Sequence, residues 1–594
     1  MTASPLFNPG LFGPRLDSKG VTFRLWAPAA TSVDLVTTET QPMRRHGDGW
    51  FDLRVPGIGA GARYKFRIDG EIDVPDPASA FQPDDVNGAS EVIDHAYAWT
   101  ARDWRGRPWH ETVILELHVG SFTPEGTYRA AISRLDDVVA AGFTAIELMP
   151  LADFYGRRNW GYDGVFLYAP DSTYGRPDDL RALIDAAHQR GLMVFLDVVY
   201  NHFGPEGNYL GRYAPQFFTD AIHTPWGSAI DYGVPQVRAF AIENALHWVA
   251  NYRFDGLRLD AVHAILKRGT PSILEDLSRA VGTFAEANGR LVHLVLENDD
   301  NAASLLDPAA PAAQGKYRAQ WNDDFHHAWH VLLTAEDKSY YRDYIEALRR
   351  HVVRTLVDGF AYQGEPSPHR GGIVRGECST HLPPTAFVSF LQNHDQIGNR
   401  ARGERLEKLA KDKRGIEAAL AIMLLAPSPP LMFMGEEWGA DQPFPFFCDF
   451  AGDLAEAVRN GRRKEFAEEY IAGNPDEIPD PLAEQTFRSA VLDWTARERP
   501  AHEKRLALVT ELLATRRAQI VPRLARGVKP GEGSFKGPVL IARWPAEGGR
   551  LELVANLSAA SAPRPHAPAG TPFWGGPSPA DLPPWGVYWS WSPA

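Results

Sequence analysis

The chain has 594 residues, of which 44% are hydrophobic and 23% are charged, and its formal net charge is −14. This length favours several domains, although one α/β barrel can use well over half of it. The acidic balance argues against nucleic acid and anionic membranes as partners, because both select clustered Lys and Arg. A neutral substrate is therefore favoured.

The two cysteines, Cys378 and Cys448, lie far apart in the sequence, so neither a disulfide framework nor a thiolate metal site is expected. Two reduced, buried thiols are the simplest interpretation. Residues 1–10 lack a basic region followed by an apolar one, and no run of eighteen apolar residues occurs in the chain. These patterns predict a soluble, cytoplasmic protein.

The amino-terminal part alternates apolar and polar residues in short runs separated by Pro, Gly and Asp. We expect a small β-sandwich module over residues 1–95. Residues 73–103 are rich in Pro, Asp and Ala and show no long period, which predicts a linker on the surface. The strands expected in this part are 21–27, 32–36, 50–55 and 63–68.

From Val113 onward, short apolar runs alternate with amphipathic helical stretches, a pattern typical of a parallel sheet. Seven strands can be recognised, and an eighth near residues 317–321 would close a (β/α)₈ TIM barrel, which we place at residues 96–520. The expected strands are 113–118, 145–149, 193–197, 256–259, 291–296, 387–391 and 431–434. The expected helices are 128–141, 177–190, 236–251, 272–287, 340–357, 413–425 and 502–517.

After residue 435 the pattern loosens until about residue 500. Two further strands, 538–544 and 550–556, are joined by a Glu-Gly-Gly turn and predict a small β-domain over residues 521–594. Residues 559–584 are rich in Pro, Ala and Gly and are expected to be irregular.

Polar residues collect where the barrel strands end. Asp197 with Asn201 and His202, Arg258 with Asp260, Glu297, and the triplet 393–395 each follow an apolar run. Active sites of such barrels lie at the carboxyl ends of the strands. A single cluster of this kind can be a helix cap, but four in equivalent positions are hard to explain as caps.

These residue types suit the hydrolysis of a glycosidic bond by two carboxyl groups. Arg258 lies two residues before Asp260 on the same face of a strand, so it can keep Asp260 ionised as a nucleophile. Glu297 follows an apolar strand and precedes Asp299 and Asp300, a setting expected to raise its pKa and keep it a proton donor. Asp395 can stabilise a positively charged transition state without transferring a proton.

Four segments resemble the signature regions of the α-amylase clan of retaining glycoside hydrolases. They are Asp-Val-Val-Tyr-Asn-His at 197–202, Gly-Leu-Arg-Leu-Asp at 256–260, Glu297, and Asn-His-Asp at 393–395, in the clan's order. The resemblance implies that Asp260 is the nucleophile, Glu297 the general acid/base and Asp395 the transition-state stabiliser. It also implies that five further residues contact or flank the sugar: Arg258, His202, His394, and Tyr162 with Asp163 at the stacking-tyrosine position.

Within the clan, residues 296–301, 320–327 and 393–400 are most similar to the members that release trehalose from maltooligosyltrehalose. This implies hydrolysis of the α-1,4 bond next to the terminal trehalose unit, with trehalose and a maltooligosaccharide as products. One departure from ordinary amylases is that His263 occupies the position of a lysine and Ala264 that of a histidine. The resemblance adds these substrate contacts: His263, Asp323, Asp324, His326, His327 and Gln396.

Several alternatives stay open at this point. The same carboxylates could serve a glycogen branching or α-1,6 debranching enzyme, or the barrel could be a glycan-binding protein without catalysis. Asp323, Asp324, His326 and His327 could instead form a metal site, although sugar contacts are preferred. We expect no cofactor and no essential metal. The amino-terminal module either binds glycan or packs against the barrel, and the oligomeric state is left open.

Overall fold

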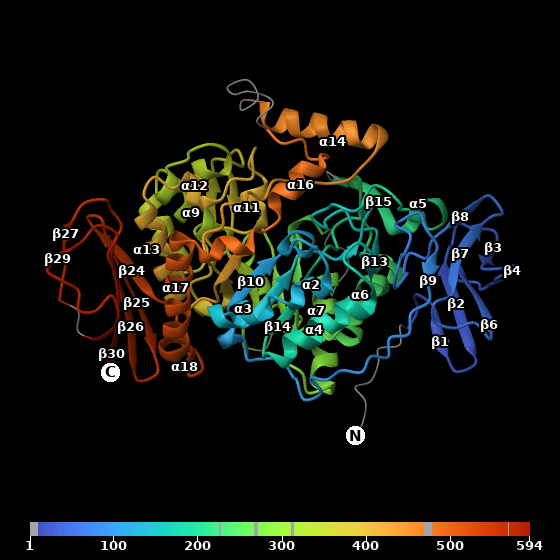
Figure 1. Cartoon of the computed structure of the whole chain (residues 1–594), viewed down its shortest axis with the longest axis horizontal. Helices are drawn as coiled ribbons and strands as arrows, with labels where there is room; N and C mark the ends of the chain where they lie inside the picture. The colour runs from blue at the N-terminus through green and yellow to red at the C-terminus, as the bar shows by residue number, and fades with distance from the viewer. Residues whose placement is uncertain (1–9, 225–226, 266–270, 310–313, 468–477, 568–569) are drawn as a thin grey trace.

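A computed structural model describes residues 10–224, 227–265, 271–309, 314–467, 478–567 and 570–594. In Figure 1 a central barrel lies between two β-structures, the amino-terminal one at one end of the molecule and the carboxyl-terminal one at the other. Residues 1–9, on which part of the leader prediction depends, lie outside the described residues. The domain boundaries after residues 95 and 520 stay predictions.

The barrel is an eight-stranded parallel sheet in the described part of the chain, in the order β22-β19-β18-β17-β14-β11-β10-β23. Ser389 closes it through backbone hydrogen bonds with Pro429 and Leu431. The barrel and its eighth strand, β19, are thus confirmed. The strands are β10 (Ile114–Leu117), β11 (Ala145–Leu148), β14 (Met193–Val198), β17 (Gly256–Leu259), β18 (His293–Leu296), β19 (Ala319–Trp321), β22 (Phe387–Val388) and β23 (Leu431–Phe433).

Most of the predicted helices form, with ends set by local capping. Ser272 caps α7, because its hydroxyl accepts from the amide of Glu275 and the Glu275 carboxylate accepts from the amide of Ser272. The helices that match one prediction each are α4 (Pro177–Gln189), α6 (Pro235–Asn251), α7 (Ile273–Ala287), α13 (Lys413–Leu425) and α17 (Pro500–Thr515).

Two predicted helices are interrupted. The first divides into α2 (Tyr128–Ile132) and α3 (Leu135–Ala141), and the second into a 3₁₀ turn, η5 (Ser339–Tyr344), and α10 (Leu348–Val357). The sequence also missed α9 (Asp323–Thr334) and α14 (Gly452–Glu465). In α14 only Ala455 is buried, so the helix lacks the apolar period that would have predicted it.

The amino-terminal module consists of two small antiparallel sheets, and its tryptophans face inward. Trp50 contacts Phe12, which packs in turn on Phe240 of α6, and Trp26 contacts Phe217. These rings join the module to the barrel, which favours packing over glycan binding. The sheets contain β1 (Arg15–Asp17), β2 (Gly20–Trp26), β5 (Arg44–Arg45) and β6 (Trp50–Pro56), and β3 (Val33–Val36), β4 (Thr40–Pro42), β7 (Arg63–Ile68) and β8 (Ile72–Val74).

The prediction that residues 73–103 form a surface linker is wrong for residues 73–92, whereas residues 93–103 have no helix or strand and are half-buried or exposed, as predicted. Asp76, Ser79 and Gln82 are buried, and the Tyr64 hydroxyl donates to an Asp76 oxygen at 2.8 Å. The segment is polar because its side chains hydrogen-bond inside the protein rather than to water. It contributes β9 (Ser90–Glu91), which pairs with β7.

The carboxyl-terminal domain is a five-stranded sheet in the described residues, in the order β24-β25-β26-β30-β28. Trp589 anchors it to α13 by donating from Nε1 to the carbonyl of Ala421 at 3.3 Å. Residues 559–584, expected to be irregular, contain β27 (Ala562–Pro563), β28 and β29 (Asp581–Leu582), so this expectation is partly wrong. The main strands are β24 (Glu532–Lys536), β25 (Val539–Ala546), β26 (Gly549–Asn556), β28 (Thr571–Trp574) and β30 (Val587–Pro593).

The two cysteines are free thiols in different environments. Cys448 is buried as predicted, whereas Cys378 is exposed, so the prediction of two buried thiols is wrong for Cys378. Its sulfur lies 3.3 Å from the Thr380 hydroxyl, a local contact that requires no burial. Among the described residues, every helix is too short or too polar to cross a membrane.

Candidate active site

Arg258 is the centre of the site and is fully buried on β17. Its Nη1 donates to Asp197 Oδ2 at 2.6 Å and to Asp260 Oδ1 at 2.9 Å, and its Nη2 lies 3.0 Å from Glu297 Oε2. Asp197 lies on the neighbouring strand β14, and Asp260 and Glu297 are the residues directly after β17 and β18. One guanidinium therefore joins three acidic groups, which offsets the cost of removing its charge from water.

Asp260 is held by donors on both carboxylate oxygens. Asn201 Nδ2 donates to Oδ2 at 2.7 Å, while Arg258 occupies Oδ1. These two donors fix the orientation of the Asp260 carboxylate. Its side chain is still 12% exposed. Arg258 also makes a cation–π contact with Trp321, since its Cζ lies 4.1 Å from the centre of the Trp321 ring.

Glu297 has a raised pKa, mainly because burial disfavours its charged form, with a further contribution from the nearby negative charge of Asp260. Arg258 and the amide of Ala261, which donates to Oε2 at 2.7 Å, oppose this shift. The predicted direction is confirmed. The predicted cause is wrong for Asp299 and Asp300, because both carboxylates pair with arginines of the facing loop.

Asp395 lies in the first turn of α11 (His394–Gly398), which Asn393 caps by accepting from the amides of Asp395 and Gln396. Its side chain is 36% exposed. Its Oδ1 accepts from Asn399 Nδ2 at 3.2 Å. The capping interaction holds Asp395 at the barrel mouth, because its backbone amide is bound by the side chain of the N-cap residue, two positions earlier.

One side of the site consists of packed rings. Tyr162 stacks on His394 with centroids 5.1 Å apart, and its hydroxyl donates to Asp197 Oδ2 at 2.5 Å. His202 contacts the backbone carbonyl of Tyr162 at 2.9 Å and the side chain of Asn201. Burial lowers the pKa of His202, so this imidazole is neutral near pH 7.

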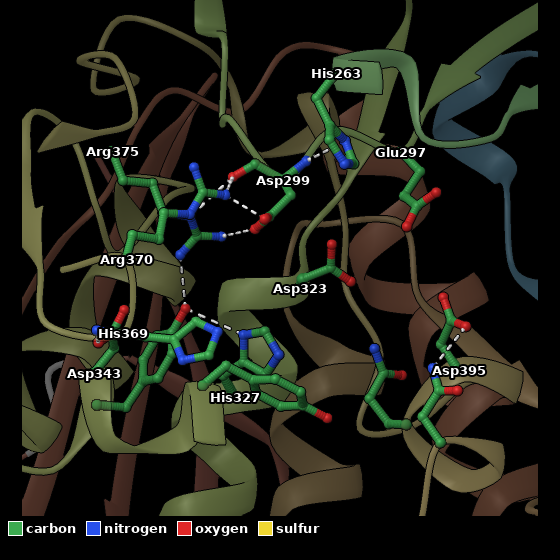
Figure 2. Close-up of a pocket in the computed structure, with 14 residues that line it drawn as sticks. His263, Glu297, Asp299, Asp323, His327, Asp343, His369, Arg370, Arg375 and Asp395 are labelled. Atoms are coloured by element: carbon green, nitrogen blue, oxygen red, sulfur yellow. Dashed lines mark hydrogen bonds and ion pairs between the residues drawn. The ribbon is translucent and has the colours of Figure 1, made fainter. Parts of the chain in front are cut away.

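A pocket of about 270 Å³ opens beside these groups. Figure 2 shows Glu297 and Asp395 at one side, the arginines with Asp299 at the other, and Asp323 between them. Burial first, and then Glu297, Asp299 and Asp395, raise the pKa of Asp323. The pocket is lined by His263, Glu297, Asp299, Asp323, His327, Tyr340, Asp343, Tyr344, His369, Arg370, Arg375, Asp395, Gln396 and Asn399.

Four predicted substrate contacts line this pocket: His263, Asp323, His327 and Gln396. Seven others do not. Arg258, His202, Tyr162 and His394 belong to the part of the site around Asp197 and the packed rings, and three more are held by protein groups. His326 is buried between the carbonyl of Leu391 and the Tyr341 hydroxyl, and Asp163 accepts from Asn159 Nδ2 at 2.7 Å.

Asp324 is the third of the predicted contacts that protein groups hold outside the pocket, because five protein donors surround its carboxylate. Arg375 Nη1 and the Tyr344 hydroxyl donate to Oδ1, and Oδ2 accepts from Asn301 and from the amides of Ala361 and Tyr362. The described residues also contain no group of three or more His, Cys, Asp or Glu side chains that could hold a metal ion. The metal-site alternative for residues 323–327 thus receives no support.

The sequence missed one whole side of the pocket. Its residues come from η5, from the turn between β20 (Glu365–Ser367) and β21 (Ile373–Arg375), from the end of β21, and from the end of α11. The one sequence feature that could have indicated this side of the pocket is the His-Arg-Gly-Gly segment at 369–372. It carries charge and predicts a turn, but it matches no catalytic pattern. The missed residues are Tyr340, Asp343, Tyr344, His369, Arg370, Arg375 and Asn399, together with Asp299, which the sequence had placed only as a neighbour of Glu297.

Asp324→Asn is expected to destabilise the fold by about 3 kcal/mol, because it removes the buried charge partner of Arg375 and leaves only the half-exposed Asp299. Burial alone would raise the pKa of Asp324, but Arg375 and the hydrogen bonds lower it to about 2, from an ordinary value of 3.8. This stabilisation is present above about pH 4 and is lost as the pH falls towards 2. Denaturant unfolding from pH 7 to pH 3 measures the difference between the two proteins.

The adjacent Asp323→Asn is the matched control for stability. Its carboxyl group has no hydrogen bond within the described structure and a raised pKa, so the amide replaces a neutral acid of the same shape. Its unfolding free energy should stay close to that of the unaltered protein. Equal losses in the two variants would contradict the role given to Asp324.

Three family models match the chain. Residues 81–217 match the alpha amylase catalytic domain, and residues 11–81 match carbohydrate-binding module 48, the isoamylase N-terminal domain. Residues 532–589 match a domain of unknown function.

Curated relatives extend this likeness to most of the chain. The malto-oligosyltrehalose trehalohydrolase of Deinococcus radiodurans is 44% identical over 91% of this chain and 88% of its own length. That of Saccharolobus solfataricus is 40% identical over 81% of this chain and 83% of its own length. A 1,4-alpha-glucan branching enzyme of Mycobacterium ulcerans is 30% identical, over 71% of this chain and 59% of its own length.

Solved structures agree with the fold. A Salmonella typhimurium protein described as an alpha amylase superposes with a TM-score of 0.93 at 44% identity, covering 98% of this chain and 99% of its own. A pullulanase of Paenibacillus barengoltzii, at 18% identity and a TM-score of 0.72 over 99% of this chain and 96% of its own, shares the fold. By its extended similarity to the curated relatives, the chain belongs to the malto-oligosyltrehalose trehalohydrolase family, within the α-amylase family of glycoside hydrolases.

Proposed function

We propose that this protein hydrolyses the α-1,4-glucosidic bond next to the terminal trehalose of maltooligosyltrehalose and releases trehalose and a maltooligosaccharide. The observation that carries the proposal is the placement of Asp260 and Glu297 on one guanidinium, Arg258, at the carboxyl ends of the barrel strands. The relatives named malto-oligosyltrehalose trehalohydrolase supply the choice of substrate within the family.

In the first step, Asp260 attacks the anomeric carbon and the bond to the glycosidic oxygen breaks. Glu297 gives its proton to that oxygen, so trehalose leaves as a neutral sugar. The raised pKa of Glu297 supports this role, because the carboxyl group must be protonated at the start. The maltooligosaccharide remains as an ester on Asp260.

In the second step, the ionised Glu297 removes a proton from water, and the water oxygen attacks the same anomeric carbon. The ester bond to Asp260 breaks, and Glu297 ends protonated, ready for another turn. Two displacements at one carbon retain the α configuration. Asp395, half-exposed at the pocket, stabilises the positive charge that develops on the sugar in both steps.

The pocket supplies hydrogen bonds to a neutral, hydroxyl-rich ligand. Asp323 lies between the two sides of the pocket (Figure 2), and its carboxyl group has no hydrogen bond within the described structure, so it can pair with sugar hydroxyls. His263, His327 and Gln396 provide further polar contacts at the wall. Arg258, His202, His394 and Tyr162 surround the sugar at the cleavage point in this proposal, whereas Asp163, Asp324 and His326 support the wall from behind.

The alternatives are less favoured. The chain aligns with 59% of the length of the Mycobacterium ulcerans branching enzyme at 30% identity. It aligns with 88% of the length of the Deinococcus radiodurans trehalohydrolase at 44% identity. A glycan-binding protein without catalysis does not require a carboxyl pair shared by one buried arginine. A cytoplasmic location is part of the same proposal and is supported by the two free thiols, since reducing compartments keep thiols unpaired.

Incubation with maltotriosyltrehalose tests the proposed function. The expected products are trehalose and maltotriose, identified by chromatography and mass spectrometry. Glycogen and a branched α-1,6 glucan serve as competing substrates in parallel reactions. New α-1,6 branches, or release of linear chains from the branched glucan at a higher rate than trehalose release, would contradict the proposal.

A further inference from the structure

Glu116 and Glu147 are buried carboxyl groups beneath the site that the mechanism above does not use. They occupy paired positions on β10 and β11, and each is 1% exposed. Their environments differ. Glu116 contacts His394 on two atoms, whereas both oxygens of Glu147 have no hydrogen-bond partner in the described structure.

The contacts of His394 indicate the state of its ring. Glu116 Oε1 lies 2.5 Å from Nδ1, and Glu116 Oε2 accepts from the backbone amide at 3.1 Å. The other ring nitrogen, Nε2, lies 3.5 Å from Asp395 Oδ1. Ionised carboxylates only accept hydrogen bonds, so a ring that faces one on each side needs a proton on both nitrogens.

We propose that Glu116 is a positioning residue that keeps His394 doubly protonated during turnover, so that Nε2–H is always directed towards Asp395 and the bound sugar. Glu116 touches neither substrate nor the reacting atoms. It acts through His394, whose ring stacks on Tyr162 at the wall of the site.

The charged groups around His394 are consistent with this state. Burial alone would lower its pKa, but Glu116 and Asp395 outweigh that effect and raise it to about 9. Arg258 opposes the charge of His394, whereas burial first, and His394 to a lesser extent, lower the pKa of His118 to about 4, so that ring adds no charge. Burial raises the pKa of Glu147, so this neighbour is a neutral acid and adds no second negative charge. Tyr162, whose pKa burial also raises, stacks on the ring of His394.

Glu116→Gln tests the proposal, with Glu147→Gln as the matched control. Without the carboxylate, burial lowers the pKa of His394, so the cation survives only at lower pH. At pH 7.5 the kcat/KM for maltotriosyltrehalose should fall by roughly 100-fold. The alkaline limb of the kcat/KM profile should move to lower pH, and Glu116→Asp should partly restore both properties.

The control makes the same chemical change at the paired position of the neighbouring strand. Because Glu147 is neutral, Glu147→Gln should leave kcat/KM within about twofold and the pH profile unmoved. A purely structural role of Glu116 would lower activity equally at all pH values. A pH profile of Glu116→Gln that is parallel to that of the unaltered protein would therefore overturn the proposal.

The charge of His394 can also be read without turnover. In protein labelled with ¹⁵N-histidine, the His394 signals, assigned by their loss in His394→Asn, should be those of an imidazolium from pH 6 to pH 8. Titration of His394 in the unaltered protein below pH 7 would overturn the proposal even if Glu116→Gln failed to fold. The activity readout rests on the proposed function, whereas the spectrum does not, so the two can fail separately.

Discussion

Asp260→Asn is expected to lower kcat on maltotriosyltrehalose by about 10⁴-fold or more, because an amide cannot form the ester at the anomeric carbon. Substrate binding should persist, since the contacts that hold the ground state come from the rest of the pocket. The side chain keeps its shape, and its oxygen can still accept from Arg258 or Asn201. Initial rates and calorimetric binding to the intact substrate measure the two effects.

Asp136→Asn is the matched control for this variant. Asp136 is an exposed aspartate that also pairs with an arginine, Arg190, at 2.7 Å. A surface pair of this kind contributes little, so activity should be unchanged. If Asp260→Asn hydrolysed the substrate at a rate close to that of Asp136→Asn, Asp260 could not be the nucleophile.

The barrel and the grouping of its catalytic-type residues could be predicted because both depend on local pattern. The run Gly256–Leu259 is short, apolar and followed by Asp260, and the structure makes it strand β17 with the same bounds. The carboxyl ends of the parallel strands meet on one face of the barrel. Polar residues that the sequence places at the end of each strand are therefore expected to lie close together. Asp197, Arg258, Asp260 and Glu297 come together as that reasoning requires.

Other features depend on contacts between distant segments, which no local pattern records. Asp324 resembled a ligand contact in sequence, yet its partners include Arg375, 51 residues away. Glu116 lies 278 residues from His394. Residues 73–103 looked like a linker because polar composition suggests exposure, and only the folded chain provides their buried hydrogen-bond partners.

Glu297→Gln is expected to lower turnover of maltotriosyltrehalose by roughly 10³-fold, because trehalose then leaves without a proton. In the unaltered protein, activity should fall as the pH rises through the raised pKa of Glu297. In the variant this limb should disappear, and only the fall set by His394, whose pKa is raised to about 9, should remain. Glu286→Gln, at an exposed position of α7, is the matched control and should keep both the rate and the limb.

A substrate that needs no acid separates the two roles proposed for Glu297. Fluoride leaves from a maltooligosyl fluoride without protonation, so Glu297→Gln should still form the ester on Asp260. The ester should then accumulate, because water cannot attack efficiently without the base that the variant lacks. Azide carries no proton to remove, so it should attack the ester and release the maltooligosyl group as an α-glycosyl azide. Asp260→Asn should give no such product. If azide failed to speed turnover of the fluoride by Glu297→Gln, this glutamate would not be the base of the second step, whatever its part in the first.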